Sequence, residues 1–105
     1  MPRPPNLDNC TIYHIREIES RCVVYVGSTT NFTKRKYAHK STCNTVGNSH
    51  YNYPIYEHIR ETGGLHLYEL IPVLHFTCTS IMELHIAEQQ EIDRHTGLFN
   101  AKYAV

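Results

Sequence analysis

A chain of 105 residues, of which 41% are hydrophobic, is long enough for one small domain with a modest core and too short for a two-domain enzyme. Its ten Lys and Arg residues balance its ten Asp and Glu residues, so net charge alone does not indicate a nucleic-acid partner. The sequence shows neither a membrane-spanning apolar stretch nor the apolar core of a signal peptide, and its four cysteines stand singly, as is typical of free thiols. We therefore expect an intracellular protein in a reducing compartment.

The first part of the chain predicts a lead-in followed by two strands. Residues 1–9 contain three prolines and are expected to be extended. Residues 10–16 and 22–27 are rich in β-branched and aromatic side chains, and the charged residues between them favour a hairpin.

Alternation along these strands assigns side chains to the two faces of the sheet. It predicts that Val24 and Val26 share one face, and that Val23 and Tyr25 share the other. Pairing of the two strands would bring Tyr13 close to Tyr25 on one surface.

A basic helix is expected next. Gly27 lets the backbone leave the sheet tightly, and residues 28–31 are rich in helix N-cap residues. In the predicted helix 31–40, Arg35 and His39 are four positions apart and therefore lie on the same face.

Charge is unevenly distributed along the chain. Lys and Arg outnumber Asp and Glu seven to three in residues 1–53, and the ratio reverses to three to seven in residues 54–105. Residues 28–52 contain no acid, and their basic and interleaved aromatic side chains are Lys34, Arg35, Lys36, Tyr37, His39, Lys40, His50 and Tyr51, with Tyr53 directly after them. This pattern favours a small phosphate-binding surface whose tyrosines stack on bases, although a solvated helix face with ordinary core tyrosines gives the same pattern.

The second half predicts a loop, a short helix and a third strand. Residues 41–53 are polar and are expected to form a loop that contacts substrate. Residues 54–60 begin with proline and are followed by the stop signal Gly63-Gly64, as is typical of a short helix. Residues 66–76 read as a strand, bulged or interrupted at Pro72, which favours an edge position.

The last predicted helix carries a carboxylate on its apolar face. Ser80 and Glu83 match a capping box, and Gly97 lies beyond the expected end. Glu88 recurs at helical spacing with the apolar residues Ile81, Leu84 and Ile92. A carboxylate in this position needs a partner, and both an arginine and a metal ion satisfy that need. Together these elements predict a small α/β sandwich, residues 10–105, with a central antiparallel sheet of about three strands flanked by helices.

The order of these residues resembles a known signature. Thr11-Ile12-Tyr13, eleven residues, Tyr25-Val26-Gly27, and then Arg35 and His39 are similar to the GIY-YIG nucleases, especially to small stand-alone members of large DNA viruses and mobile elements. The resemblance covers most of the chain and extends to the acidic helix and to Asn100. Thr11 stands where the pattern has its first glycine.

The resemblance implies the GIY-YIG fold and a divalent-metal-dependent DNA endonuclease that cuts one strand per active site with weak sequence specificity. It implies that Tyr13 is the general base and that Glu88 holds Mg²⁺ or Mn²⁺. The other implied catalytic residues are Tyr25, Arg35 and His39, with Gly27, Lys34 and Asn100 as supporting residues, and Lys34, Arg35, Lys36, Lys40, Tyr51 and Tyr53 as DNA contacts. Glu91 and Asp93 are expected to be solvent-facing companions of Glu88.

Elementary chemistry agrees with these roles. Mg²⁺ prefers oxygen ligands and keeps several waters, so one carboxylate is enough when substrate phosphate supplies another ligand. The planar guanidinium of Arg35 suits the oxygens of a phosphate. A phenol with an ordinary pKa near about 10 is a poor base at neutral pH, so Tyr13 needs nearby positive charge from Lys34, Arg35 or the metal.

Partners and competing functions follow from the same residues. One site per chain means that a double-strand break needs a homodimer or two events, and a partner protein is a possible source of specificity. The first alternative is a nucleic-acid binding module that does not cleave. The second is a zinc-stabilised domain. The nearest candidate ligands are Cys43 with His39 or His50, whereas most zinc sites take paired ligands at close spacing.

Overall fold

The computed structural model describes residues 7–100, and the predicted segments at 1–6 and 101–105 lie outside the described residues. The elements, in chain order, are β1 (Cys10–Glu17), β2 (Val23–Thr29), α1 (Phe32–Asn44), α2 (Pro54–Glu61), a 3₁₀ turn (Leu65–Leu67), β3 (Tyr68–Phe76) and α3 (Ile81–Ile92). Among these residues no helix has the length and apolar character needed to cross a bilayer.

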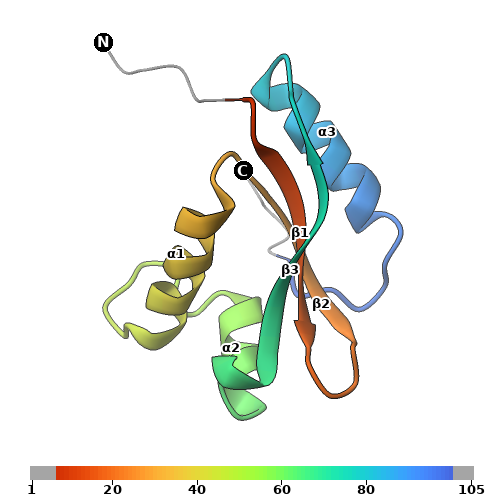
Figure 1. Cartoon of the computed structure of the whole chain (residues 1–105). Helices are drawn as coiled ribbons and strands as arrows, with labels where there is room; N and C mark the ends of the chain where they lie inside the picture. Colours follow the sequence, from red (N-terminus) through yellow and green to blue (C-terminus); the bar gives the residue numbers. More distant parts are fainter. Residues whose placement is uncertain (1–6, 101–105) are drawn as a thin grey trace.

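The three strands form one antiparallel sheet in the order β2-β1-β3, with β1 in the centre. Figure 1 shows α1 and α2 on one side of this sheet and α3 on the other. The predicted α/β fold with a three-stranded antiparallel sheet flanked by helices is therefore confirmed.

Side chains from the two faces of the sheet pack into two separate clusters. The α1/α2-side core consists of buried residues from β1, β2, α1, α2 and β3: Tyr13, Ile15, Val24, Cys43, Ile55, Tyr56, Ile59 and Tyr68. The α3-side core is smaller and consists of Cys10, Ile12, Val26, Cys78 and Leu84. Because β1 is central, its side chains contribute alternately to both cores.

The alternation predicted for the second strand is wrong. Ile15 pairs with Tyr25 and Arg16 pairs with Val23, which leaves Val24 as the extra residue of a β-bulge. The bulge places Val24 in the α1/α2-side core, on the same side as Tyr25, whereas Val26 belongs to the α3-side core. A strand pattern read with strict period two cannot show such an insertion.

The third strand lies at the edge of the sheet, as Pro72 predicted. Tyr13 pairs with Pro72 and Ile12 with Leu74, so the bulge falls on Val73, directly after the proline. The strand begins at Tyr68 rather than at residue 66, because residues 65–67 form the 3₁₀ turn.

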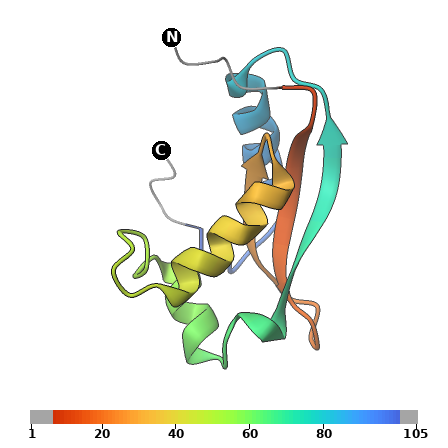
Figure 2. The same cartoon turned by 60° about the vertical axis from the view of Figure 1, so that its left-hand side comes forward.

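Helix α1 is longer than predicted. Its N-cap is Asn31, whose side chain accepts a hydrogen bond from the backbone N–H of Lys34 at 3.0 Å. The helix continues to Asn44 because Thr42 and Cys43 are buried, so the expected loop shrinks to 45–53. In Figure 2 this loop, drawn in yellow-green, projects away from the sheet.

The last helix begins as predicted but is capped differently. The Ser80 hydroxyl accepts a hydrogen bond from the backbone N–H of Glu83, whereas the Glu83 carboxylate bonds to Thr79 instead of returning to the N-cap. Helix α3 ends at Ile92, and Gly97 has a φ of +74° in the turn that follows.

The described part of the predicted lead-in is attached to the fold. The carbonyl of Leu7 accepts a hydrogen bond from the backbone N–H of Cys78 at 2.9 Å, and its side chain packs against the α3-side core. Residues 7–9 are therefore held by the domain. All four cysteines are free thiols, as expected.

Candidate functional site

Tyr13 lies at the centre of the candidate site. It is 1% exposed and projects from β1 towards α1. Its ring centroid lies 6.3 Å from that of Tyr25, 5.7 Å from Phe32 and 5.6 Å from His39. The two signature tyrosines are therefore neighbours on one face of the sheet, as the predicted hairpin requires.

His39 joins two phenols inside this cluster. Its Nε2 lies 2.6 Å from the Tyr13 hydroxyl, and its Nδ1 lies 2.7 Å from the hydroxyl of Tyr56 on α2. Burial, aided by the charge of Arg35, lowers the pKa of His39 to about 4. At neutral pH the imidazole is uncharged and has one N–H, so it donates to one phenol and accepts from the other. Both nitrogens are thereby engaged, which excludes His39 as a zinc ligand in this conformation.

Burial raises the pKa of the phenols. The pKa of Tyr13 rises well above its ordinary value because of burial, and that of Tyr56 rises to about 12 for the same reason. Burial and the negative charge of Glu88 raise the pKa of Tyr25. Arg35 lowers the pKa of all three but does not outweigh burial. In the protein without added ions, Tyr13 is therefore a neutral phenol.

Glu88 reaches the same site from the other side of the sheet. The side chain is half-buried on α3, which packs against β2. Burial raises its pKa, while hydrogen bonding to Ser28 and the charges of His85 and Arg35 act in the opposite direction. The Glu88 charge in turn raises the pKa of Tyr13 and Tyr25.

The arginine partner considered for Glu88 is not at ion-pair distance. Within residues 7–100, the ion pairs with a nitrogen–oxygen distance of 4.0 Å or less do not include Glu88. Glu88 is therefore a half-buried carboxylate that hydrogen-bonds to Ser28 and lies near the charges of His85 and Arg35.

Arg35 is the exposed cation of the site. It lies on the first turns of α1 and affects the pKa of Tyr13, Tyr25, His39 and Glu88 together. The other predicted basic contacts, Lys34, Lys36 and Lys40, are also exposed on α1.

Gly27 has a steric role. It pairs with Tyr13 across the hairpin, and a Cβ at this position would lie 2.4 Å from both Cζ and the hydroxyl oxygen of that ring. Any side chain here would collide with the buried phenol. The glycine of the second tripeptide is therefore needed for space beneath Tyr13.

Asn100 supports β2 from its outer edge. Its Oδ1 accepts a hydrogen bond from the backbone N–H of Val26 at 3.1 Å, and its Nδ2 donates to the carbonyl of the same residue at 2.6 Å. The neighbouring backbone N–H of Phe99 donates to the carbonyl of Val24 at 2.7 Å. Residues 99–100 thus satisfy backbone groups of this edge strand.

The predicted aromatic contacts differ in availability. The guanidinium of Arg60 lies 3.6 Å from the ring centre of Tyr51, so one face of that ring is covered. Tyr53 stacks on His50 with ring centroids 4.5 Å apart. Tyr37 on α1 is 69% exposed. Of these three tyrosine rings, that of Tyr37 is therefore the most accessible for stacking on a base.

Two grooves border α1. One, of about 660 Å³, is lined by Thr11, Asn31, Lys34 and His75 among others, and the second, of about 630 Å³, by Lys36, Tyr37, Lys40 and Tyr68 among others. Phe32 lines both. Basic residues therefore lie beside hollows on each side of the helix.

Sequence reasoning missed two members of the site and misplaced a third residue. Tyr56 and Ser28 are joined to His39 and Glu88, respectively, through pairings between distant elements. Glu91 is not solvent-facing as expected, because its carboxylate is 18% exposed and accepts from His14 and His95. The sequence contained a signal for the burial of Glu91, because Glu91 is three residues from Glu88 and so lies close to the same face of α3.

Comparisons of the chain with protein-family models, curated proteins and solved structures find no match. Its function is therefore inferred from its own residues and their geometry.

Proposed function

We propose that the chain is a GIY-YIG-type DNA endonuclease that uses a divalent cation to hydrolyse one strand per active site, with weak sequence specificity. One observation carries the proposal: Tyr13, Tyr25, Arg35, His39 and Glu88 come from four different elements. Each is linked to other members of this set by a hydrogen bond, a ring contact or the effect of its charge on their pKa. A packing cluster alone has no need for a guanidinium and a carboxylate beside buried phenols.

Glu88 fits the cation that this chemistry requires. Its desolvated carboxylate is a hard oxygen ligand, and the adjacent Ser28 offers a second oxygen. When bound, Mg²⁺ or Mn²⁺ would neutralise negative charge on the phosphate and favour ionisation of nearby groups.

The substrate surface consists of exposed side chains on α1. Arg35 would hold the nonbridging oxygens of the scissile phosphate with its planar fork. Lys34, Lys36 and Lys40 would contact neighbouring phosphates, and Tyr37 would stack on a base or sugar.

The Tyr13–His39–Tyr56 chain would orient a water through the Tyr13 hydroxyl. In the tautomer with hydrogen on Nδ1, His39 donates to Tyr56 and accepts from Tyr13. The Tyr13 oxygen, which also hydrogen-bonds to Tyr25, then keeps a lone pair that would accept a hydrogen bond from water. Removal of a proton by Tyr13 itself requires positive charge beyond that of Arg35, because burial dominates its pKa.

The test is nicking of supercoiled plasmid by the purified chain with Mg²⁺ or Mn²⁺, beside an EDTA control. We expect nicked circles from the wild type, at least about a hundredfold less nicking from Glu88→Gln, and wild-type nicking from the matched control Glu61→Gln, whose carboxylate is exposed on α2. Equal nicking by Glu88→Gln and wild type would contradict the proposed cation ligand. If Tyr13→Phe nicks plasmid as fast as the wild type, Tyr13 is not the general base.

A binding module that does not cleave is favoured by one observation, the 1% exposure of Tyr13. This alternative predicts retention of DNA in a low-salt gel shift without nicking under any metal condition. It also predicts that Glu88→Gln leaves DNA affinity unchanged or raises it, because the variant removes a negative charge near the phosphate.

A further inference from the structure

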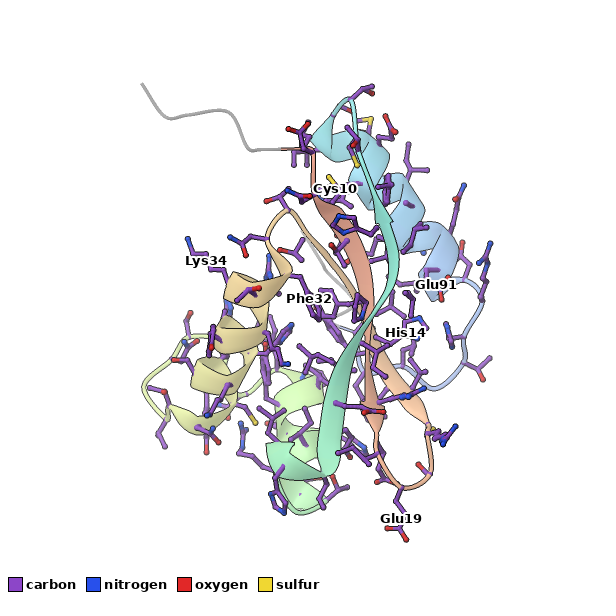
Figure 3. The ribbon with its side chains drawn as sticks, in the orientation of Figure 1. Cys10, His14, Glu19, Phe32, Lys34 and Glu91 are labelled. Atoms are coloured by element: carbon purple, nitrogen blue, oxygen red, sulfur yellow. The ribbon has the colours of Figure 1, made fainter. Side chains whose placement is uncertain are left out.

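A second cluster of polar side chains lies on the opposite face of the sheet from Tyr13. The Nε2 of His14, on β1, lies 2.7 Å from Oε2 of Glu91, on α3. The Nε2 of His95, just beyond α3, lies 3.1 Å from the same oxygen. Figure 3 shows His14 and Glu91 next to each other between the central strand and the helix. Three donor atoms, from β1, from α3 and from the segment just after α3, therefore lie close together.

The three side chains are oriented as a ligand set. Their donor atoms all lie within 4.8 Å of one another, and all three side chains are half-buried. Donor atoms bound to one tetrahedral zinc ion lie about 3.3 Å apart, as follows from zinc–ligand distances of about 2.0–2.1 Å. Small side-chain movements would therefore place an ion among them.

Neighbouring groups support the carboxylate. Nη1 of Arg94 lies 3.3 Å from Oε1 of Glu91, so the second carboxylate oxygen is held from outside the cluster. Burial alone would raise the pKa of Glu91, but hydrogen bonds from His14 and His95 outweigh burial and lower it. A hollow of about 330 Å³ bordered by Glu91, Gln90 and Leu74 gives solvent access to this side of the carboxylate. These are features of an oriented, accessible metal ligand.

We propose that His14, Glu91 and His95 form a binding site for a transition-metal ion of the zinc type. Two imidazoles and one carboxylate suit Zn²⁺ and exclude Mg²⁺ as the preferred ion, because Mg²⁺ takes oxygen ligands. Three protein ligands leave a fourth position for water. The bound ion links β1 to α3, the helix that also carries Glu88.

This site is separate from the proposed nuclease centre in ligands and in ion. The cation of the nuclease centre would be held by Glu88 on oxygen ligands, whereas the second ion is held mainly by imidazole nitrogen. The two proposals therefore succeed or fail independently.

The test is calorimetric titration of Zn²⁺ into the full chain after chelator treatment, without DNA or Mg²⁺. We expect about one equivalent to bind the wild type, and at least about tenfold weaker binding by His95→Ala and by Glu91→Gln, because loss of a direct ligand costs no less than loss of a supporting group. His95 lies after the end of α3, so its removal leaves the helix and sheet intact. The matched control is His66→Ala, an exposed histidine in the 3₁₀ turn, which should bind zinc as the wild type does.

Cobalt distinguishes this site from the free cysteines. Co²⁺ bound by the proposed ligands gives visible d–d bands without the near-ultraviolet charge-transfer band of thiolate ligation, and Cys22→Ser leaves the spectrum unchanged. Glu88→Gln should retain zinc binding whether or not the wild type nicks DNA. The proposal is overturned if His95→Ala binds zinc as tightly as the wild type, if the cobalt spectrum shows thiolate bands that vanish in Cys22→Ser, or if the wild type binds no zinc.

Discussion

Two neighbouring residues of β1, Tyr13 and His14, face opposite sides of the sheet and enter two different kinds of polar cluster. On the α1/α2 side, His39 is 3% exposed and hydrogen-bonded to two phenols. On the α3 side, His14 is half-buried and hydrogen-bonded to the Glu91 carboxylate. On the α1/α2 side a histidine has two neutral phenols as partners, whereas on the α3 side two histidines contact one charged carboxylate.

The pKa shifts express this difference. Burial lowers the pKa of His39 to about 4, because a charged imidazole there lacks both water and an anionic partner. The carboxylate on the opposite face is instead stabilised in its charged form by hydrogen bonds from two imidazoles. Depth of burial separates the two clusters: the His39 side chain is almost fully buried, whereas the side chains of His14 and Glu91 are partly exposed to solvent.

The largest expected effect concerns the difference in packing depth. Ile59 of α2 is 0% exposed, whereas Ile86 of α3 is 54% exposed. We expect Ile59→Ala to lower the free energy of unfolding by about 2–5 kcal/mol and Ile86→Ala by less than about 0.5 kcal/mol. Urea denaturation of both variants measures this. Similar losses in the two would mean that burial of Ile59 in the α1/α2-side core contributes no more to stability than an exposed position on α3.

The next effect concerns protonation of His39. Its folded pKa is about 4 against an ordinary 6.5, so the unfolded chain binds more protons than the folded one between these values. Above pH 6.5, His39 does not change the free energy of unfolding with pH. As pH drops from 6.5 to 4, that free energy falls by about 3 kcal/mol in total.

Urea denaturation at a series of pH values measures this slope. We expect His39→Gln to flatten it between pH 6.5 and 4, and the exposed control His66→Gln to retain it. For Glu91, whose folded pKa is lowered, stability is instead lost as pH falls below the ordinary value of 4.5. An unchanged slope in His39→Gln would contradict the assignment of this acid sensitivity to His39.

Gly27 tests how tightly the Tyr13 side is packed. We expect Gly27→Ala to lower the free energy of unfolding by about 1–3 kcal/mol, because the new methyl group would overlap the buried Tyr13 ring. Gly47 in the loop has no atom within 4 Å of an added Cβ, so Gly47→Ala is the matched control. Equal stability of the two variants in thermal denaturation would mean that Tyr13 moves freely, contrary to a preorganised site.

The sequence was sufficient to predict the features on the α1/α2 side of the sheet that depend on local geometry. Tyr13 and Tyr25 meet because a short hairpin pairs their strands, and the edge position of β3 follows from Pro72. Helical spacing correctly placed Arg35 and His39 on one side of α1 and put Glu88 on a partly buried face. Each of these inferences uses residues within one element or one turn.

The remaining features depend on pairings that no local pattern encodes. Tyr56 joins the site because α2 packs on α1, and Glu91 meets His14 across 77 positions of sequence. The bulge at Val24 changes which side chains share a face, and strict alternation does not reveal it. The depth of burial that keeps Tyr13 neutral is likewise a property of the assembled core.

Asn100 is expected to have the smallest effect, and it tests whether the two faces are coupled. The segment before it touches both cores, since Leu98 packs on the α3 side and Phe99 on the α1/α2 side. Asn100→Ala removes two hydrogen bonds to Val26, and we expect a loss of about 1–2 kcal/mol in the free energy of unfolding. The matched control is Asn52→Ala in the exposed loop. Hydrogen exchange at backbone amides locates the effect: faster exchange on both α1 and α3 would show that this edge segment couples the faces, whereas a change confined to β2 would show that each face is stabilised by its own core.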